Sequence, residues 1–110
     1  MHIITENGEL CAMADLLGSV VSAYNGRSSV NVNGTAHSFA SCTGRVELIV
    51  GGHTHSDSTG ILGGVRYIIT TNFTNSNKPT FDLMLADYSN RVLHAVRVGA
   101  GSSRTINLAQ

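Results

Sequence analysis

The spacing of apolar residues changes once along the chain, and this change constrains the fold more than any other feature. From Leu10 to Tyr24, apolar residues recur at steps of three and four, as they do in a helix that is buried along one side. This pattern predicts one amphipathic helix over residues 9–24, with Asn7 as its cap and Asn25-Gly26 as its end. After this point apolar and polar residues alternate, which is typical of strands. We therefore expect a fold of the broad α/β class, more specifically α+β, in which most elements are strands and there is one main helix.

The strand patterns begin directly after the helix. Asn33-Gly34 is the dipeptide best suited to a two-residue type I′ turn, and alternating residues on both sides of it predict a hairpin. Val46 to Val50 is an apolar run interrupted only by Glu47, and we expect it to form a central strand buried on both faces. A strand is also expected near residues 65–70, a second hairpin over 81–98, and a final strand over 105–108.

Composition limits the possible functions. The chain has 110 residues, with seven basic and seven acidic side chains, so we expect one domain or part of one. A formal charge of zero does not provide the clustered Lys and Arg that nucleic-acid binding needs. No apolar run approaches the roughly 20 residues of a membrane span, and no export signal is recognisable. Together with Cys11 and Cys42, which we interpret as buried thiols, this predicts a cytoplasmic protein.

One short motif carries most of the chemistry. Gly52-His53-Thr54-His55 follows immediately after the apolar run and Gly51. Two imidazoles at positions i and i+2, on a loop that leaves a strand, can converge on adjacent metal ions, because neutral nitrogen donors suit zinc, iron and manganese. In open α/β sheets, ligands gather outside the carboxyl ends of strands, which is where this loop is expected. The motif therefore predicts a metal site.

Gly52-His53-Thr54-His55 after a hydrophobic strand resembles the last signature, G-H-x-H, of the calcineurin-like metallophosphoesterases. The stretch from residue 46 to about 104 is similar in particular to phage and prophage members of this family of hydrolases. The resemblance implies a four-layer αββα sandwich, two mixed sheets flanked by helices, with a two-metal site of Mn, Fe or Zn at the strand ends. It also implies that His2 and His53 ligate one metal and His55 the other.

The earlier signatures of the family, D-x-H, G-D-x-x-D and G-N-H-D/E, do not occur in the sequence. By the resemblance, they would supply the carboxylate and asparagine ligands and the histidine that protonates the leaving group. Residues 1–110 are therefore expected to form a single partial domain, the C-terminal half of the sandwich. Without carboxylates to offset the repulsion between two cations, three histidines would hold at most one ion. We assign no catalytic residue and expect negligible phosphatase activity from the chain alone.

Two residues have alternative interpretations. Asp57 can accept a hydrogen bond from a ligating imidazole and fix its tautomer, or it can be a solvated loop residue. His2 is either a metal ligand or a terminal residue without such a role.

Three functional hypotheses follow. The first is a fragment of a two-metal phosphoesterase, which acts on phosphate esters when its missing N-terminal half is supplied. The second is a non-catalytic structural module that forms a homodimer to cover its sheet faces and edges, in keeping with its low content of charged residues. The third is a metal-binding protein without catalysis.

Overall fold

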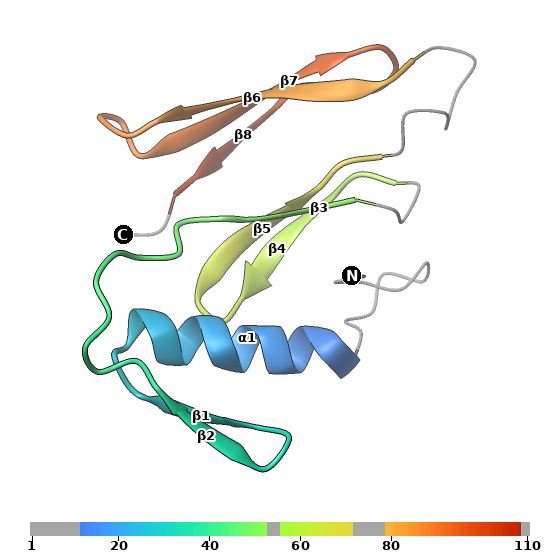
Figure 1. Ribbon diagram of the computed structural model, residues 1–110. Coiled ribbons are helices and arrows are strands. Elements are labelled where there is room, and N and C mark those ends of the chain that lie inside the picture. Colours follow the sequence, from blue (N-terminus) through green and yellow to red (C-terminus); the bar gives the residue numbers. More distant parts are fainter. Residues whose placement is uncertain (1–11, 53–55, 72–78, 109–110) are drawn as a thin grey trace.

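The computed structural model describes residues 12–52, 56–71 and 79–108. Within these residues it has an α+β fold, mostly strands with one helix and three small sheets, as the sequence predicts (Figure 1). In chain order the elements are α1 (Ala12–Asn25), β1 (Ser29–Val32), β2 (Thr35–Ser38), β3 (Ile49–Gly51), β4 (Ser58–Leu62), β5 (Val65–Ile69), β6 (Phe81–Asp87), β7 (Val92–Val98) and β8 (Arg104–Asn107).

The helix α1 matches its predicted end, and residues 1–11, with the expected cap at Asn7, lie outside the described residues. Ala14 and Val21 are buried as expected, whereas Met13 of the same stripe is 56% exposed. The residue with left-handed backbone beyond the helix is Arg27, with a φ of 56°, rather than Gly26. Arg27 is held there because its guanidinium donates to the carbonyl oxygens of Tyr24 and Gly44.

The first hairpin is confirmed. Strands β1 and β2 pair antiparallel, and Val32 lies opposite Thr35. Asn33 and Gly34 have φ values of 50° and 82°, which are the left-handed values that a type I′ turn requires at both central positions.

The second sheet has the order β3-β5-β4, with β3 parallel and β4 antiparallel to β5. The strand expected at residues 46–50 is observed as β3 over Ile49–Gly51, and it is not buried on both faces. Val50 of β3 is 55% exposed, and within the described residues β3 pairs with β5 alone. Its apolar sequence does not decide how many neighbours the strand has. Strand β4 is absent from the sequence prediction, because Gly60 and polar residues interrupt its pattern.

The third sheet has the order β6-β7-β8 and is antiparallel throughout. It confirms the predicted hairpin over residues 81–98 and the final strand, which begins one residue earlier than expected, at Arg104.

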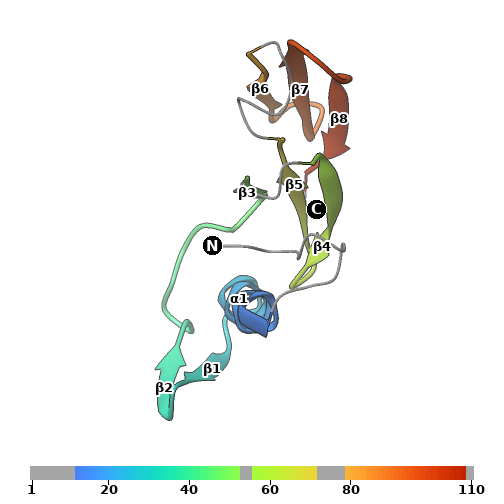
Figure 2. The ribbon, with the colours of Figure 1, turned by 90° about the vertical axis from the view of Figure 1, so that its right-hand side faces the viewer.

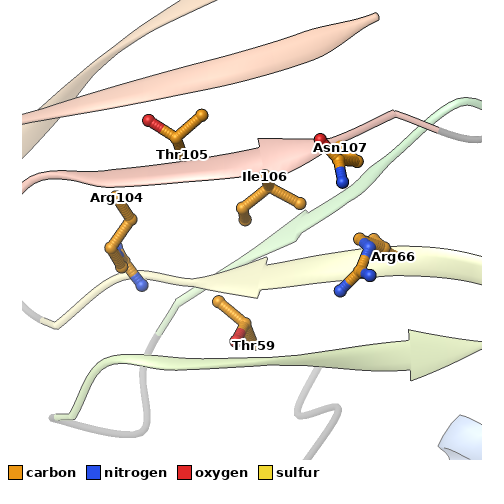
Figure 3. A pocket seen from close by; sticks show the side chains of 6 residues that line it. All are labelled: Thr59, Arg66, Arg104, Thr105, Ile106 and Asn107. Atoms are coloured by element: carbon orange, nitrogen blue, oxygen red, sulfur yellow. The ribbon is translucent and has the colours of Figure 1, made fainter.

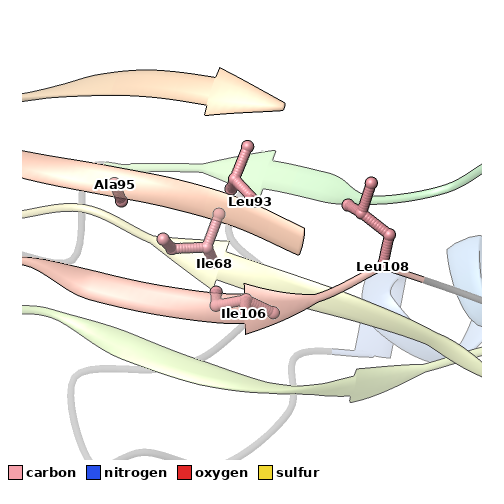
Figure 4. Packing of buried hydrophobic residues seen from close by; sticks show 5 residues of the cluster. All are labelled: Ile68, Leu93, Ala95, Ile106 and Leu108. Carbon is pink, nitrogen blue, oxygen red and sulfur yellow. The ribbon is translucent and has the colours of Figure 1, made fainter. Parts of the chain in front are cut away.

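The described elements stack in layers, with α1 on one face of β3-β5-β4 and the third sheet on the other face (Figures 1 and 2). Strand β5 is shared between two apolar clusters, because its side chains alternate. Tyr67 and Ile69 pack with Ala14 and Leu62 beneath the helix. The cluster between the sheets contains Ile68, Leu93, Ala95, Ile106 and Leu108 (Figure 4).

The outer face of β6 and β7 is apolar and exposed. Leu83 and Leu85 are each 64% exposed, and no layer of the described residues covers them. Phe81, Val96 and Val98 are exposed on the same two strands. The described part of the chain is therefore a three-layer α-β-β structure with an open apolar face.

Candidate functional site

The segment between β3 and β4 leaves the sheet at the carboxyl end of β3, where the sequence predicts the metal site. His53 and His55 belong to this segment and, like His2, lie outside the described residues. Their roles as metal ligands therefore stay predictions. Within the residues that the structure does describe, no group of three His, Cys, Asp or Glu side chains could hold a metal ion.

Both ends of this segment are fastened to the chain just beyond β5. The backbone N–H of Thr70 donates to the carbonyl oxygen of Gly51 at 3.1 Å. The backbone N–H of Thr71 donates to Oδ1 of Asp57 at 2.9 Å. Since β3 and β5 are parallel, their carboxyl ends meet at one edge of the sheet, and the segment starts and finishes at that edge.

Asp57 belongs to an ion cluster that the sequence does not predict. Its Oδ1 accepts a hydrogen bond from Nη2 of Arg97 at 2.6 Å and lies 3.5 Å from Nη2 of Arg104. The predicted hydrogen bond to an imidazole remains untested, because His53 and His55 lie outside the described residues. The alternative interpretation of Asp57, as a solvated loop residue, does not account for its contacts with these two arginines.

The centre of the cluster is the pair of Arg97 and Asp82, whose side chains are only 2% and 1% exposed. Nε of Arg97 lies 2.6 Å from Oδ1 of Asp82, and Thr70 donates its hydroxyl to Oδ2 of Asp82 at 2.7 Å. Arg104 also donates to Asp82 and, through Nη1, to the carbonyl oxygen of Ile69 at 2.8 Å. We call Asp57, Asp82, Arg97 and Arg104 the Arg97 cluster.

The cluster joins the second and third sheets electrostatically. Burial alone would raise the pKa of Asp82, but hydrogen bonds from Arg97, Thr70 and Arg104 outweigh it and hold this pKa below its ordinary value. The pKa of Asp57 is lowered in the same way, chiefly by the hydrogen bond from Arg97 acting against burial. These two carboxylates raise the pKa of Arg97. Two carboxylates and two guanidiniums leave the cluster with no net charge.

The loop after β7 completes the surroundings of Arg97. Its Nη1 donates to the carbonyl oxygen of Ala100 at 2.7 Å, and its backbone N–H donates to the hydroxyl of Ser103 at 2.9 Å. Gly101 has a φ of 98°, and a Cβ at this position would lie 2.3 Å from Nη1 of Arg97. The loop therefore needs glycine at residue 101 to close around the guanidinium.

The sequence contains one signal for this cluster, which can be recognised only once the register of β6 and β7 is known. Asp82 and Arg97 lie directly opposite each other in the β6–β7 register, on the inward-facing side that also carries Met84 and Ala95. A charged residue at an inward position of each strand of a hairpin indicates a buried pair.

The remaining residues of chemical interest lie away from this edge. His37 is exposed on β2. Cys42 has a free thiol and is half-buried rather than buried, and Cys11 lies outside the described residues. Helix α1, the helix of the described part, is neither long nor apolar enough to cross a membrane.

Comparison of the chain with known protein families, with curated proteins and with solved structures finds no match. Only the residues of the chain and their geometry therefore bear on its function.

Proposed function

We propose that the chain is the C-terminal part of a calcineurin-like metallophosphoesterase domain. In this proposal, His53 and His55 contribute imidazole ligands to a divalent-metal site, and carboxylates from an N-terminal part complete it. The observation that carries the proposal is that β3 ends at Gly51, at the edge where two parallel strands end, and that the G-H-T-H motif follows Gly51 directly in the sequence. This edge is where ligands gather in sheets of this kind.

The exposed face of the third sheet supports the proposal. A four-layer αββα sandwich places helices on the outer face of each sheet, whereas the described residues form three layers (Figure 2). Leu83 and Leu85 are the most exposed apolar residues of the uncovered face. Large contiguous apolar patches on a protein surface mark sites where another element or another protein binds. A helical layer from an N-terminal part would cover this face.

The pairing of β3 within the described residues gives a second argument. The apolar run that ends in β3 has the composition of a central strand, yet β3 has a single neighbour within the described residues. An edge strand presents unpaired N–H and C=O groups that can accept a further strand. Strands from an N-terminal part would give β3 the second neighbour that its sequence favours.

The donor set near this edge fits a metal only in part. Imidazole nitrogens suit manganese, iron and zinc, and two such cations supply Lewis acidity for displacement at phosphorus. The carboxylates of Asp57 and Asp82 are both bound by arginines, so they are not available to bridge two cations. The chain by itself would therefore hold at most one divalent ion and would lack phosphoesterase activity. Its own contribution is to fasten both ends of the ligand-bearing segment to β5.

Metal binding and activity together test this proposal. Titration of the chain with Co²⁺, followed by visible absorption, is expected to show one bound ion per chain and no second. Binding should be lost in a His53→Ala/His55→Ala double variant and kept in His37→Ala, a matched change on the exposed face of β2. Absence of binding, or binding unaffected by the double variant, would remove the support for the metal site. Hydrolysis of a generic phosphodiester with Mn²⁺, lost on His55→Ala, would contradict the expected inactivity.

A second candidate function is a non-catalytic module that forms a homodimer. The same uncovered face of β6 and β7 favours it, because a second copy can cover apolar residues that no other layer covers. A homodimer and a complete phosphoesterase domain use this face in mutually exclusive ways.

A further inference from the structure

A polar pocket opens between the second and third sheets, beside the Arg97 cluster. Its volume is about 450 Å³, which is within the range of small-molecule sites. The lining residues come from β4, β5 and β8, and they are Thr59, Arg66, Arg104, Thr105, Ile106 and Asn107 (Figure 3). Ile106 is the one apolar side chain among these six residues. A pocket with this lining favours a polar ligand.

The pocket contains one positive charge that no carboxylate of the described residues offsets. Arg104 is paired with Asp82 and Asp57, so its charge is compensated. Arg66 is exposed, and no acidic residue of the described part forms an ion pair with it. Arginine carries five N–H donors in a planar fork that matches phosphate and carboxylate oxygens. The end of the pocket at Arg66 is therefore suited to an anionic group.

Arg104, at the opposite end of the pocket, has a buried hydrogen-bond donor without an acceptor in the described structure. Nη1 and Nη2 of Arg104 are bound to Ile69, Thr70 and Asp82, but its Nε–H is buried and has no partner in the described structure. A buried donor without a partner is rare in proteins and costs free energy. An oxygen atom of a ligand beside Arg104 would supply the missing acceptor after a small movement of this side chain.

The order of the side chains along the pocket defines the ligand further. Figure 3 shows Arg66 and Asn107 toward one end and Arg104 toward the other, with Thr59 and Ile106 between them. A phosphate at Arg66 can also accept a hydrogen bond from the amide of Asn107. Beyond it there is space for a short carbon skeleton against Ile106 and for hydroxyl groups that reach Thr59 and Arg104.

We infer that this pocket binds a small phosphate monoester with a hydroxylated body, of the size of a sugar phosphate. The phosphate lies on Arg66 and Asn107, and the body extends toward Arg104. The formal charge of zero for the whole chain argues against a polyanion as the ligand. This inference does not depend on the proposed metal site, because none of the lining residues belongs to the segment between β3 and β4.

Calorimetric titration of the intact chain with ribose 5-phosphate tests the inference. Saturable binding is expected, and Arg66→Gln should weaken it roughly 10-fold to 100-fold, the effect of losing a charge-assisted hydrogen bond. Arg45→Gln is the matched control, since it removes the charge of another exposed arginine that does not line the pocket, and it should leave the affinity unchanged. Thr59→Val should weaken binding of ribose 5-phosphate while leaving inorganic phosphate unaffected.

Three results would overturn the inference. Equal losses in Arg66→Gln and Arg45→Gln would indicate unspecific attraction by charge. Unphosphorylated ribose that binds as tightly as ribose 5-phosphate would exclude a phosphate at Arg66. If gluconate binds equally well and with the same dependence on Arg66, the group that binds at Arg66 is a carboxylate rather than a phosphate monoester. Thermal unfolding of each variant, followed by circular dichroism, checks that the variant is folded under the conditions of the titration.

Discussion

The backbone of Gly63, in the turn between β4 and β5, lies against the carbonyl group of Gly18 in α1. A Cβ on Gly63 would lie 2.3 Å from the Gly18 oxygen, which is closer than any real contact of this kind. Gly63 also has a φ of 59°, in the left-handed region that favours glycine. This contact seats the helix at one end of β5, and the Arg97 cluster lies at the other end.

Replacement of Gly63 tests this contact. We expect Gly63→Ala to lower the free energy of unfolding by about 1–3 kcal/mol more than Gly64→Ala does. Both positions have positive φ, but nothing lies within 4 Å of a Cβ at Gly64, so the difference isolates the contact with Gly18. Urea unfolding measures it, and equal losses for the two variants would contradict the close packing of α1 on this turn.

Removal of one partner of the buried ion pair should be among the most destabilising single substitutions in the chain. Arg97→Met leaves Asp82 buried without its main counter-ion, which is expected to cost about 3–5 kcal/mol. Arg91→Met removes the partner of Glu47 in a half-exposed pair and should cost only about 0–1 kcal/mol. A loss in Arg97→Met as small as that in Arg91→Met, measured by denaturant unfolding, would argue against a structural role for the cluster.

The lowered pKa values of Asp57 and Asp82 predict a dependence of stability on pH. A carboxylate whose folded pKa lies below its unfolded value stabilises the fold above the unfolded pKa, near 3.9 for Asp, and loses this contribution as pH falls through the folded pKa. The free energy of unfolding should therefore decrease as pH falls below about 4. The decrease should be shallower in Asp82→Asn, and an identical slope in that variant would be the contrary result.

If the chain binds a metal through His53 and His55, Asp57 should act as a positioning residue. Its carboxylate ties the segment that contains both histidines to Thr71 and Arg97. Loss of such a supporting contact typically lowers metal affinity about 10-fold to 100-fold, and we expect this for Asp57→Asn in a Co²⁺ titration. Asp87→Asn, a change in the β6–β7 hairpin, is the control and should bind as the wild type does. Unchanged affinity in Asp57→Asn would show that the segment does not need this anchor.

The uncovered face of the third sheet predicts self-association when no other layer covers it. Sedimentation equilibrium is expected to give a dimer, which Leu83→Lys should convert to a monomer, because Leu83 is 64% exposed on this face. Ile61→Lys is the control, since Ile61 is 61% exposed but belongs to β4. A wild-type chain that is monomeric at high concentration would exclude the homodimer.

Local patterns were sufficient to predict most of the elements. The helix, the Asn33-Gly34 hairpin and the hairpin over residues 81–98 depend on the spacing of neighbouring residues, which a sequence displays directly. Strand β4 was missed, although its turn at Gly63-Gly64 is a hairpin signal. The exposure of Val50 in β3 was not predicted, because the burial of a strand depends on long-range packing that its own sequence does not display.

The sequence by itself determined one helix followed by strands, and it identified the G-H-T-H motif and where that motif leaves its strand. Only the tertiary structure decided the order of the strands, the burial of Asp82 with Arg97, and the pocket at Arg66. Asp57 and Arg97 are 40 residues apart in the chain, and no local spacing relates them. They meet because two sheets pack face to face, and buried charges in such an interface are stable only when each finds its partner there.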